Sequence, residues 1–516
     1  MTTVATANGQ VRGTFDGDVH AFKGVPFGGP TGGRARFQPP SPAPTWTGVR
    51  DCQEYGPACP QAPTALRPDD APVLVALFDA PIHHPQSEDC LTLNVWTPGV
   101  VGPANRPVIV HVHAGAFQFG WTAWNMYDGS ALARAGDAVV VSLTYRLGVL
   151  GFLHLAELGG DEFAHSGNVG VLDIIAALRW IRENIAAFGG DPDNVTLLGE
   201  SAGGGAVITL MAMPEATGLF HRAVSVSAGG AQGVPAGQAT ETAQAVLKEL
   251  GVEPDNLSAL YQMSPGRLIR AHLMAGASRG PFTMGGTFRF GPVIDGCHLL
   301  ESPIEAAAHG AAADVPLLIG SAKDEMTLLA ADLAHQLNEV GVREILGAML
   351  GDHAEPVFET FSRGRPLATP GELLLAIWSD CTRIPSLRLA ESHLATGTAP
   401  VYCYLFTWES PIEGGKYGST HILDAPFWFR TVDAAPITGN APERYQLADR
   451  MSGALLAFAR SGDPNHPGLP HWPAYQVGDR PTMVWNTVCE VSTDPFGQER
   501  AVLEPVPLRR LSARGL

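Results

Sequence analysis

The sequence predicts an α/β protein with a central, mostly parallel, doubly wound sheet. Short uninterrupted apolar runs recur along its 516 residues, and such runs are typical of central strands that are covered on both faces. Segments with a helical spacing of apolar residues lie between these runs, and this alternation places successive strands in parallel. Hydrophobic residues make up 45% of the chain and charged residues 16%, which indicates a large core.

The expected elements follow in chain order. Residues 3–27 are predicted to form short strands with turns at Asn8-Gly9 and Asp16-Gly17. Further strands are expected at residues 91–96, 108–113, 138–143, 195–198, 223–227, 315–319 and 401–405. Residues 171–188 carry a broad apolar stripe and predict a helix. The weakly patterned regions 60–85 and 232–287 are interpreted as insertions above the sheet, so residues 1–516 are expected to form a single domain.

Composition narrows the possible partners and locations. A net charge of −18 disfavours nucleic acid and anionic membranes as partners. The chain contains no apolar run long enough to span a bilayer, and it does not begin with a basic segment followed by an apolar one. We therefore expect a cytoplasmic protein. The seven cysteines are scattered with no C-x-x-C pair, so neither a disulfide framework nor a zinc site is expected. The sequence leaves the oligomeric state open.

One short segment carries the strongest chemical signal. Residues 195–204 read VTLLGESAGG, in which an apolar strand is expected to turn sharply at Ser201 and to continue as a helix. In this G-x-S-x-G pattern, Gly199 and Gly203 leave room for the turn, and the hydroxyl stands clear of the sheet at the positive end of the helix. Because a serine hydroxyl is a poor nucleophile at its free pKa, the pattern predicts a base and an orienting acid elsewhere.

A second loop of small residues follows the predicted strand at residues 108–110. The sequence from 111 to 117 reads HVHAGAF. A tight loop after a strand can direct successive backbone N–H groups to one point, as an oxyanion requires. An ordinary glycine turn is the alternative interpretation, and the serine motif favours the oxyanion hole.

Together these motifs resemble those of the type B carboxylesterase family of the α/β-hydrolases, which includes cholinesterases and bacterial para-nitrobenzyl esterases. The resemblance covers nearly the whole chain, in order, through FKGVPF (22–27), SEDCLTLNVW (87–96), YRLGVLGF (145–152), NIAAFGGDP (184–192), GPVIDG (291–296) and GDP (462–464). It implies an α/β-hydrolase fold with helical insertions over the active site. It also implies hydrolysis of a small-molecule ester through an acyl-enzyme, with no metal and no organic cofactor.

The resemblance further implies a catalytic triad. The acid is Glu325 in the run GSAKDE. The adjacent Asp324 is an alternative candidate, and the residues alone do not decide between the two carboxylates. The base is His421 in the run GSTHILD. The chain order Ser201, Glu325, His421 agrees with the nucleophile–acid–histidine order of α/β-hydrolases. If the histidine keeps an ordinary pKa near ~6.5, activity is expected to rise with pH through that region.

Backbone N–H groups of Gly115, Ala116 and Ala202 are the oxyanion donors that the resemblance implies. Ala114 and Ala116 stand where many relatives have glycine. We expect alanine to be tolerated with a negative φ, leaving less room beside Ala114. Glu200 resembles a family residue that organises water near the histidine, and an exposed turn carboxylate is the alternative.

Substrate contacts are expected from residues in segments that could line the site: Phe117, Glu200, Phe288, Phe290 and Trp428. The aromatic members favour neutral, partly apolar esters, and core packing is their alternative role. Cholinesterases have a tryptophan between the two matched cysteines, but Phe78 is the only aromatic residue between Cys59 and Cys90 here, so a choline ester is not expected. Carbamate or amide hydrolysis by the same triad is an alternative function, and a non-catalytic binding protein is another.

Two structural ion pairs are also implied by the resemblance, Arg36 with Glu88 and Arg146 with Asp173. The cysteines 59 and 90 match a pair that is bridged in secreted relatives, and we expect them to be reduced in a cytoplasmic protein.

Overall fold

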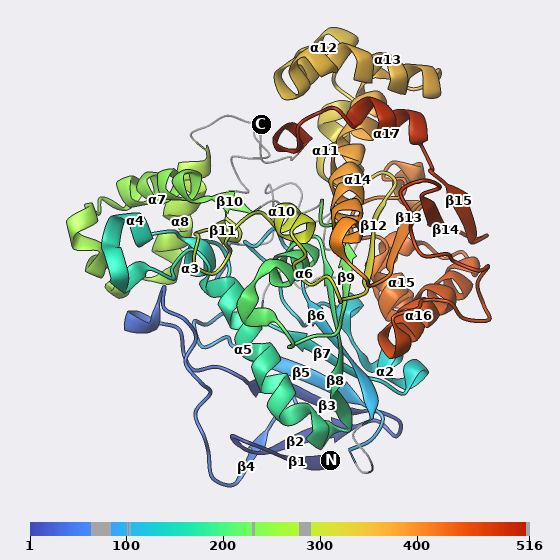
Figure 1. The fold of residues 1–516 in the computed structure, drawn as a ribbon. Coiled ribbons are helices and arrows are strands. Elements are labelled where there is room, and N and C mark those ends of the chain that lie inside the picture. The colour runs from blue at the N-terminus through green and yellow to red at the C-terminus, as the bar shows by residue number, and fades with distance from the viewer. Residues whose placement is uncertain (63–83, 101, 103–104, 230–232, 278–289, 512–516) are drawn as a thin grey trace.

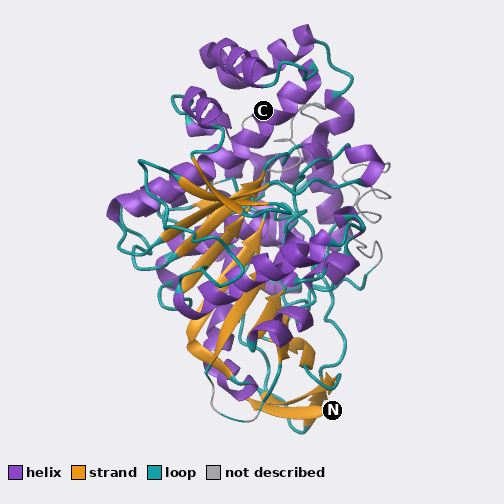
Figure 2. Ribbon diagram, turned by 90° about the vertical axis from the view of Figure 1, so that its right-hand side faces the viewer, coloured by secondary structure: helices purple, strands orange, loops and turns teal. Residues whose placement is uncertain are grey.

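A long twisted sheet runs through the molecule and carries helices on both faces (Figures 1 and 2). The structure is a computed structural model that describes residues 1–62, 84–100, 102, 105–229, 233–277 and 290–511. In this part of the chain the main sheet has 13 strands in the order β1-β2-β3-β5-β7-β6-β8-β9-β12-β13-β14-β15, with β4 paired to β2. The predicted doubly wound architecture is therefore confirmed.

The strands of the main sheet are β1 (Thr2–Thr6), β2 (Gly9–Phe15), β3 (His20–Pro26), β4 (Val49–Asp51), β5 (Thr92–Thr97), β6 (Arg106–Val112), β7 (Val139–Leu143), β8 (Gly190–Glu200), β9 (Arg222–Val226), β12 (Leu317–Ala322), β13 (Val401–Phe406), β14 (Pro481–Trp485) and β15 (Glu490–Thr493). Two short strands, β10 (Val234–Pro235) and β11 (Val293–Ile294), pair with each other. Each strand expected from an apolar run is present within a few residues of its predicted place.

Parallel pairing brings the ends of distant segments to one edge of the sheet. Strands β6 to β9 and β12 to β14 pair in parallel, and β6 lies between β7 and β8. The register aligns Val112 of β6 with Gly199 of β8, and Gly320 of β12 with Val226 of β9. Because the carboxyl ends of parallel strands meet at the same edge, the loops that follow β6, β8, β12 and β13 lie close together there.

Both faces of the central strands are buried, and this explains their uninterrupted apolar sequences. Successive side chains of a strand point to opposite faces. In β6, Val108 and Val110 belong to one apolar cluster, whereas Ile109 belongs to the cluster on the other face. Among the residues that the structure describes, no helix is both long and apolar enough to cross a membrane.

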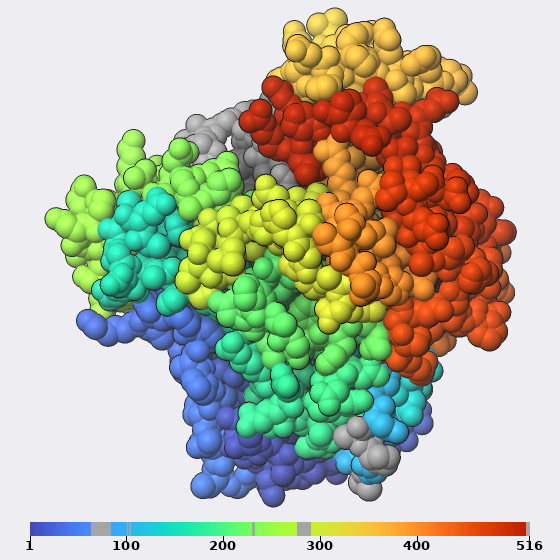
Figure 3. All heavy atoms as spheres, in the orientation of Figure 1, coloured from blue at the N-terminus to red at the C-terminus, as the bar shows by residue number. Residues whose placement is uncertain are grey.

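The α-helices vary widely in length. Their bounds are α2 (Ser130–Gly136), α3 (Gly148–Phe152), α4 (Ala156–Gly159), α5 (Val169–Asn184), α6 (Ala202–Ala212), α7 (Ala236–Leu250), α8 (Pro265–Ala277), α10 (Pro303–Ala308), α11 (Thr327–Ala334), α12 (Glu339–Leu350), α13 (Ala354–Gly364), α14 (Pro370–Thr396), α15 (Ala425–Phe429), α16 (Glu443–Ser461), α17 (Gly497–Leu503) and α18 (Leu508–Leu511). The helix predicted at 171–188 corresponds to α5 and the 3₁₀ turn that follows it. In the space-filling view, α12 and α13 form a projecting end above the segment that carries α17 (Figure 3).

The region interpreted as weakly patterned, 232–287, contains two of these helices. In α7, buried Ala239, Ala243, Val246 and Leu250 follow a helical spacing, but alanine makes the stripe weak in the sequence. Figure 1 shows α7 and α8 beside α3 and α4, to one side of the sheet. Most of the other such region, 60–85, and residues 278–289 lie outside the described residues.

Candidate active site

Ser201 stands at a sharp turn between β8 and α6. Its φ of 55° and ψ of −119° form a combination that residues with a side chain rarely adopt. A Cβ on Gly199 would lie 2.2 Å from the carbonyl carbon of Gly203, and a Cβ on Gly203 would lie 2.0 Å from the carbonyl oxygen of Val112. These contacts agree with the prediction that only very small residues fit two positions either side of the serine.

The three predicted triad side chains form one chain of hydrogen bonds. The Ser201 hydroxyl donates to Nε2 of His421 over 2.8 Å. Nδ1–H on the other side of the ring donates to Oε2 of Glu325. The second oxygen of Glu325 accepts the backbone N–H of Ala322 over 2.8 Å, and the residue is 1% exposed. The serine, the imidazole and the buried carboxylate are thus aligned in the order that proton transfer requires.

Asp324, the rival acid, occupies a different place. Its carboxylate accepts the backbone N–H of Ser419 over 2.9 Å and lies 3.4 Å from Nζ of Lys323. Ser419 is two residues before the histidine. The fold therefore brings Glu325 to the imidazole, while Asp324 holds the loop that carries it.

The acidic side chains around His421 raise the pKa of its imidazole. Burial by itself lowers the pKa of the imidazole, but the adjacent Glu325 carboxylate outweighs burial and raises it well above the ordinary value, with smaller contributions from Glu200 and Asp424. The expectation of an ordinary histidine pKa is therefore wrong. The sequence does not show that three acidic side chains surround this ring.

Glu200 lies just before the nucleophile and is buried, with 3% of its surface exposed. The alternative interpretation as an exposed turn carboxylate is therefore wrong. Its Oε1 is 3.9 Å from Nε2 of His421, and its Oε2 accepts the hydroxyl of Tyr127 over 3.1 Å. Burial raises the pKa of Glu200 to about 8, against the lowering effect of the nearby His421.

Asp424 is a member of this acidic group that the sequence reasoning missed. It is fully buried, and its Oδ2 accepts the hydroxyl of Tyr404 over 2.8 Å. Burial first, and Glu325 second, raise the pKa of Asp424 to about 6. Asp424 lies three residues after His421, and a helical turn places two residues at this spacing on the same side of the turn. This spacing was the signal from which Asp424 could have been predicted as a neighbour of the imidazole.

The oxyanion loop has a conformation that differs from the one expected. The φ angles are 123° at Gly115, 55° at Ala116 and 61° at Phe117. The expectation of a negative φ at Ala116 is therefore wrong: the alanine occupies the left-handed region that favours glycine. The carbonyl of Gly115 accepts the N–H groups of Gln118 (2.8 Å) and Phe119 (3.0 Å), and these bonds close the loop.

This conformation leaves backbone donors free. Among the residues that the structure describes, the N–H groups of Gly115 and Ala116 donate to no acceptor of the protein. The N–H of Ala202, the first residue of α6, lacks an intrahelical partner because it lies in the first turn. All three groups lie in the segments that follow the carboxyl ends of β6 and β8.

The predicted substrate-contact aromatics are deeply buried. Phe117 packs against Phe152, with ring centroids 5.2 Å apart, and Phe290 packs against His272 at 4.3 Å. Trp428 is 1% exposed, and its ring packs edge-on against Tyr404 and Trp485. Phe288 lies outside the described residues. The buried positions are compatible with core packing, so their contact with substrate stays a prediction.

The two expected ion pairs are present, and both are well shielded. Arg36 and Glu88 approach to 2.7 Å, as do Arg146 and Asp173. The cysteines 59 and 90 are free, buried thiols.

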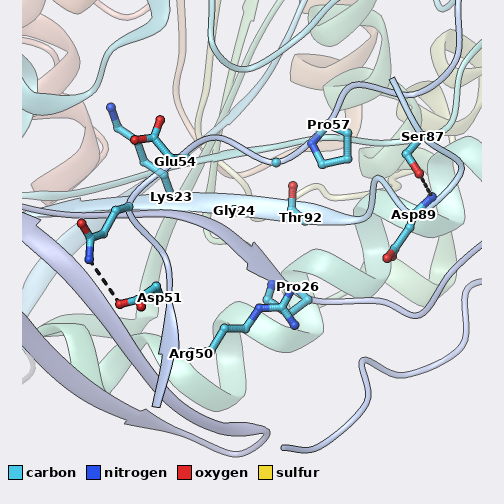
Figure 4. Close-up of a pocket in the computed structure, with 12 residues that line it drawn as sticks. Lys23, Gly24, Pro26, Arg50, Asp51, Glu54, Pro57, Ser87, Asp89 and Thr92 are labelled. Carbon is cyan, nitrogen blue, oxygen red and sulfur yellow. Dashed lines mark hydrogen bonds between the residues drawn. The ribbon is translucent and has the colours of Figure 1, made fainter. Parts of the chain in front are cut away.

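A separate pocket of about 530 Å³ lies beside β3, β4 and β5 (Figure 4). Its lining is strongly polar and includes Lys23, Arg50, Glu54 and Asp89. None of its lining residues belongs to the predicted site, so this pocket is distinct from the triad.

Within the described ranges, no three histidine, cysteine, aspartate or glutamate side chains are grouped so as to hold a metal ion.

Comparisons with known proteins agree over nearly the whole chain. A sequence model described as the carboxylesterase family matches residues 1–499. The para-nitrobenzyl esterase of Bacillus subtilis (strain 168) is 37% identical over 508 residues, covering 97% of this chain and 98% of that protein. The phenmedipham hydrolase of Pseudarthrobacter oxydans is 34% identical, covering 93% and 94%. A crystal structure of a Geobacillus stearothermophilus carboxylesterase superimposes with a TM-score of 0.85 at 37% identity, covering 97% and 100%.

Proposed function

The chain belongs to the carboxylesterase family, and from this premise we propose that Ser201, His421 and Glu325 are the residues with which it hydrolyses carboxylic esters. The observation that carries the assignment is the continuous hydrogen-bond chain from the Ser201 hydroxyl through the imidazole to Glu325. That the chain is a carboxylic-ester hydrolase follows from its family. The roles of individual residues are the proposal.

The proposed reaction proceeds in two acyl transfers. His421 takes the proton of Ser201 as Oγ attacks the ester carbonyl, and Glu325 stabilises the resulting imidazolium. The same proton passes to the departing alkoxide, leaving an acyl-serine. Water then attacks the acyl-serine with His421 again as base, which releases the acid and restores the serine. These steps use only groups of this chain, so we assign no metal and no organic cofactor.

The tetrahedral intermediates carry a negative oxygen that needs donors. We assign this role to the N–H groups of Gly115, Ala116 and Ala202, which lack protein acceptors in the described part of the chain. Glu200, held near Nε2 of His421, is assigned to organising the attacking water.

The substrate is proposed to be a neutral, partly apolar ester. Buried aromatic residues near the loops support this class, and the absence of tryptophan between Cys59 and Cys90 disfavours a choline head group. A cytoplasmic location and a single domain over residues 1–516 also remain proposals from the sequence.

The test is turnover of a panel of aryl esters by the wild type and the Ser201→Ala variant. We expect the variant to lose at least about 10⁴-fold in kcat while keeping its unfolding temperature, because the turn depends on its glycines rather than on the hydroxyl. Substantial turnover by the folded variant would refute the nucleophile assignment. The panel includes the carbamate and amide of the same acyl group, and faster turnover of either would change the proposed substrate class.

A second arm of the panel tests charge. It compares 3,3-dimethylbutyl acetate with acetylcholine at physiological ionic strength, where the overall negative charge of the protein is largely screened. A desolvated cation–π contact provides about 2 kcal/mol, or roughly thirtyfold in affinity, so its absence favours the neutral ester. A higher kcat/KM for acetylcholine would reveal a cation site elsewhere.

A further inference from the structure

Tyr127 lies where the two parts of the proposed oxyanion hole come together. It ends the 3₁₀ turn Asn125–Tyr127 and is fully buried. Its hydroxyl donates to Oε2 of Glu200 over 3.1 Å, and its ring contacts that of His111 in β6, with centroids 4.4 Å apart. His111 lies near the end of β6, the strand that leads into the oxyanion loop, and Glu200 directly precedes the nucleophile. One side chain therefore contacts both segments that carry the donors, β6 through its ring and the nucleophile turn through its hydroxyl.

Aromatic neighbours fix the position of this hydroxyl. The ring of Tyr127 is stacked on Trp124, with an interplanar angle of 8°, and contacts His111 and Phe429 with centroids 4.4 Å and 5.8 Å away. The turn is also held by Thr431, whose hydroxyl donates to the carbonyl of Met126 over 2.7 Å. The packing depends on the ring, so phenylalanine can replace tyrosine here without a cavity.

The oxyanion loop needs such a restraint. Ala116 and Phe117 both have positive φ, and strained residues keep this conformation only when their surroundings hold them. On the far side of the loop, the carbonyl of Phe117 accepts the N–H of Gly148 over 2.6 Å. Tyr127 provides a second contact, on His111 of the strand that precedes the loop.

We propose that Tyr127 is a positioning residue that holds the oxyanion loop in register with the nucleophile turn. Two donors follow β6 and the third follows β8, so the hole exists only while these segments keep their relative position. Donors must lie about 2.7–3.1 Å from the oxyanion, so small shifts between the segments weaken transition-state binding. This inference rests on the proposed roles of Ser201 and of the three N–H groups.

The Tyr127→Phe variant tests the proposal because it removes only the hydroxyl. The readouts are kcat and KM for an aryl acetate, and the affinity of a trifluoromethyl ketone. The ketone forms a covalent bond between its carbonyl carbon and Oγ of Ser201, the serine proton passes to His421, and the carbonyl oxygen becomes an oxyanion. We expect kcat and ketone affinity to fall together by about tenfold to a hundredfold, with KM changing less than about threefold.

A matched control is the Tyr404→Phe variant. It also removes a buried hydroxyl from a carboxylate, that of Asp424, but it leaves the contacts of Tyr127 with His111 and Glu200 in place. We expect its affinity for the trifluoromethyl ketone to stay within about threefold of the wild type. Equal losses in both variants would show a general effect of removing buried hydroxyls and would overturn the proposal.

A second variant keeps the proposal testable if Tyr127→Phe does not fold. Thr431→Val removes the hydroxyl that holds the turn at Met126 and leaves Tyr127 itself unchanged. It is expected to lower kcat and ketone affinity in the same direction, by a smaller factor. If folded Tyr127→Phe binds the ketone as tightly as the wild type, the inference is refuted. If only Thr431→Val folds, unchanged ketone affinity in that variant refutes it.

Failure of the proposed function gives a different result. If the ketone does not inhibit the wild type, or inhibits Ser201→Ala equally well, the nucleophile assignment is wrong. If it inhibits the wild type but not Ser201→Ala, and inhibits Tyr127→Phe as tightly as the wild type, only the role of Tyr127 is wrong.

Discussion

The candidate site combines two regions that use the chain in different ways. The proposed triad consists of side chains that are far apart in sequence: His421 is 220 residues from Ser201 and 96 from Glu325. The oxyanion loop is proposed to act through backbone N–H groups of the adjacent residues Gly115 and Ala116 rather than through their side chains. Side-chain chemistry depends on residue type, whereas backbone chemistry depends on conformation. The two regions should therefore respond to different kinds of substitution.

In the triad, a change of one functional group should have the largest effect. We expect Glu325→Gln to lower kcat by about 10⁴-fold, as loss of the orienting carboxylate does in the serine-protease template. Asp324→Asn should have a much smaller effect, because Asp324 binds the backbone of Ser419 rather than the imidazole. Steady-state kinetics of both purified variants measure the difference. If Asp324→Asn is the more damaging change, the acid has been assigned to the wrong carboxylate.

In the loop, a single methyl group should be nearly as damaging when it alters the backbone. A Cβ on Gly115 would lie 1.8 Å from the carbonyl oxygen of Phe119, so Gly115→Ala must move the loop. We expect kcat to fall about 10²- to 10³-fold, the effect of losing an oxyanion donor.

The control for this change is Gly347→Ala, in helix α12, where an added Cβ meets no atom within 4 Å. It should leave kcat unchanged and raise the stability of the helix by about 0.5–1 kcal/mol, measured by thermal unfolding. Wild-type kcat in Gly115→Ala would show that this loop does not supply the oxyanion hole.

The pH dependence of activity distinguishes the two regions, because only the triad titrates. His421 must be neutral to act as base, and its pKa is raised by Glu325 and, to a smaller extent, by Glu200. Activity is therefore expected to be lost as pH falls through a midpoint above the ordinary ~6.5. Glu200→Gln removes one source of this shift, so its midpoint should lie lower than that of the wild type. The measurement is kcat/KM against pH, and a wild-type profile that stays flat down to roughly pH 5 would contradict it.

The smallest effect is expected at Ala116. Replacement by glycine relieves a positive φ that costs an alanine about 1–2 kcal/mol, but it also makes the unfolded chain more flexible by about 0.5–1 kcal/mol. We therefore expect the unfolding free energy to change by less than about 1 kcal/mol and kcat to change less than about threefold. A tenfold loss of kcat in Ala116→Gly would mean that the methyl group itself contacts the substrate or orders the loop.

The same contrast separates what could be predicted from what could not. Ser201 and its two glycines were predictable because the turn excludes every larger residue at Gly199 and Gly203. The fold class was predictable because central strands such as β6 need apolar side chains on both faces. Choosing Glu325 over Asp324 required the resemblance, and the hydrogen bond to His421 supports that choice.

Other features depend on contacts between distant segments and leave no local pattern. The φ of Ala116 is imposed by the loop around it, since alanine on its own disfavours that conformation. Tyr127 is brought to Glu200 by tertiary packing, and no spacing in the sequence links the two. Strand β14 begins with a proline and its parallel partner is β13, so its sequence alone does not identify it as a strand.

The order of the strands has a consequence for biosynthesis. The ribosome completes Ser201 and its turn long before it reaches His421, 220 residues later. The strand that leads to this histidine, β13, can join the sheet only after β12 has provided its edge. Until His421 has been made and has docked beside Ser201, the proposed nucleophile has no base, so we expect no hydrolysis before that point. In an enzyme built this way, activity reports complete folding, and a refolding experiment can follow the return of turnover as its final step.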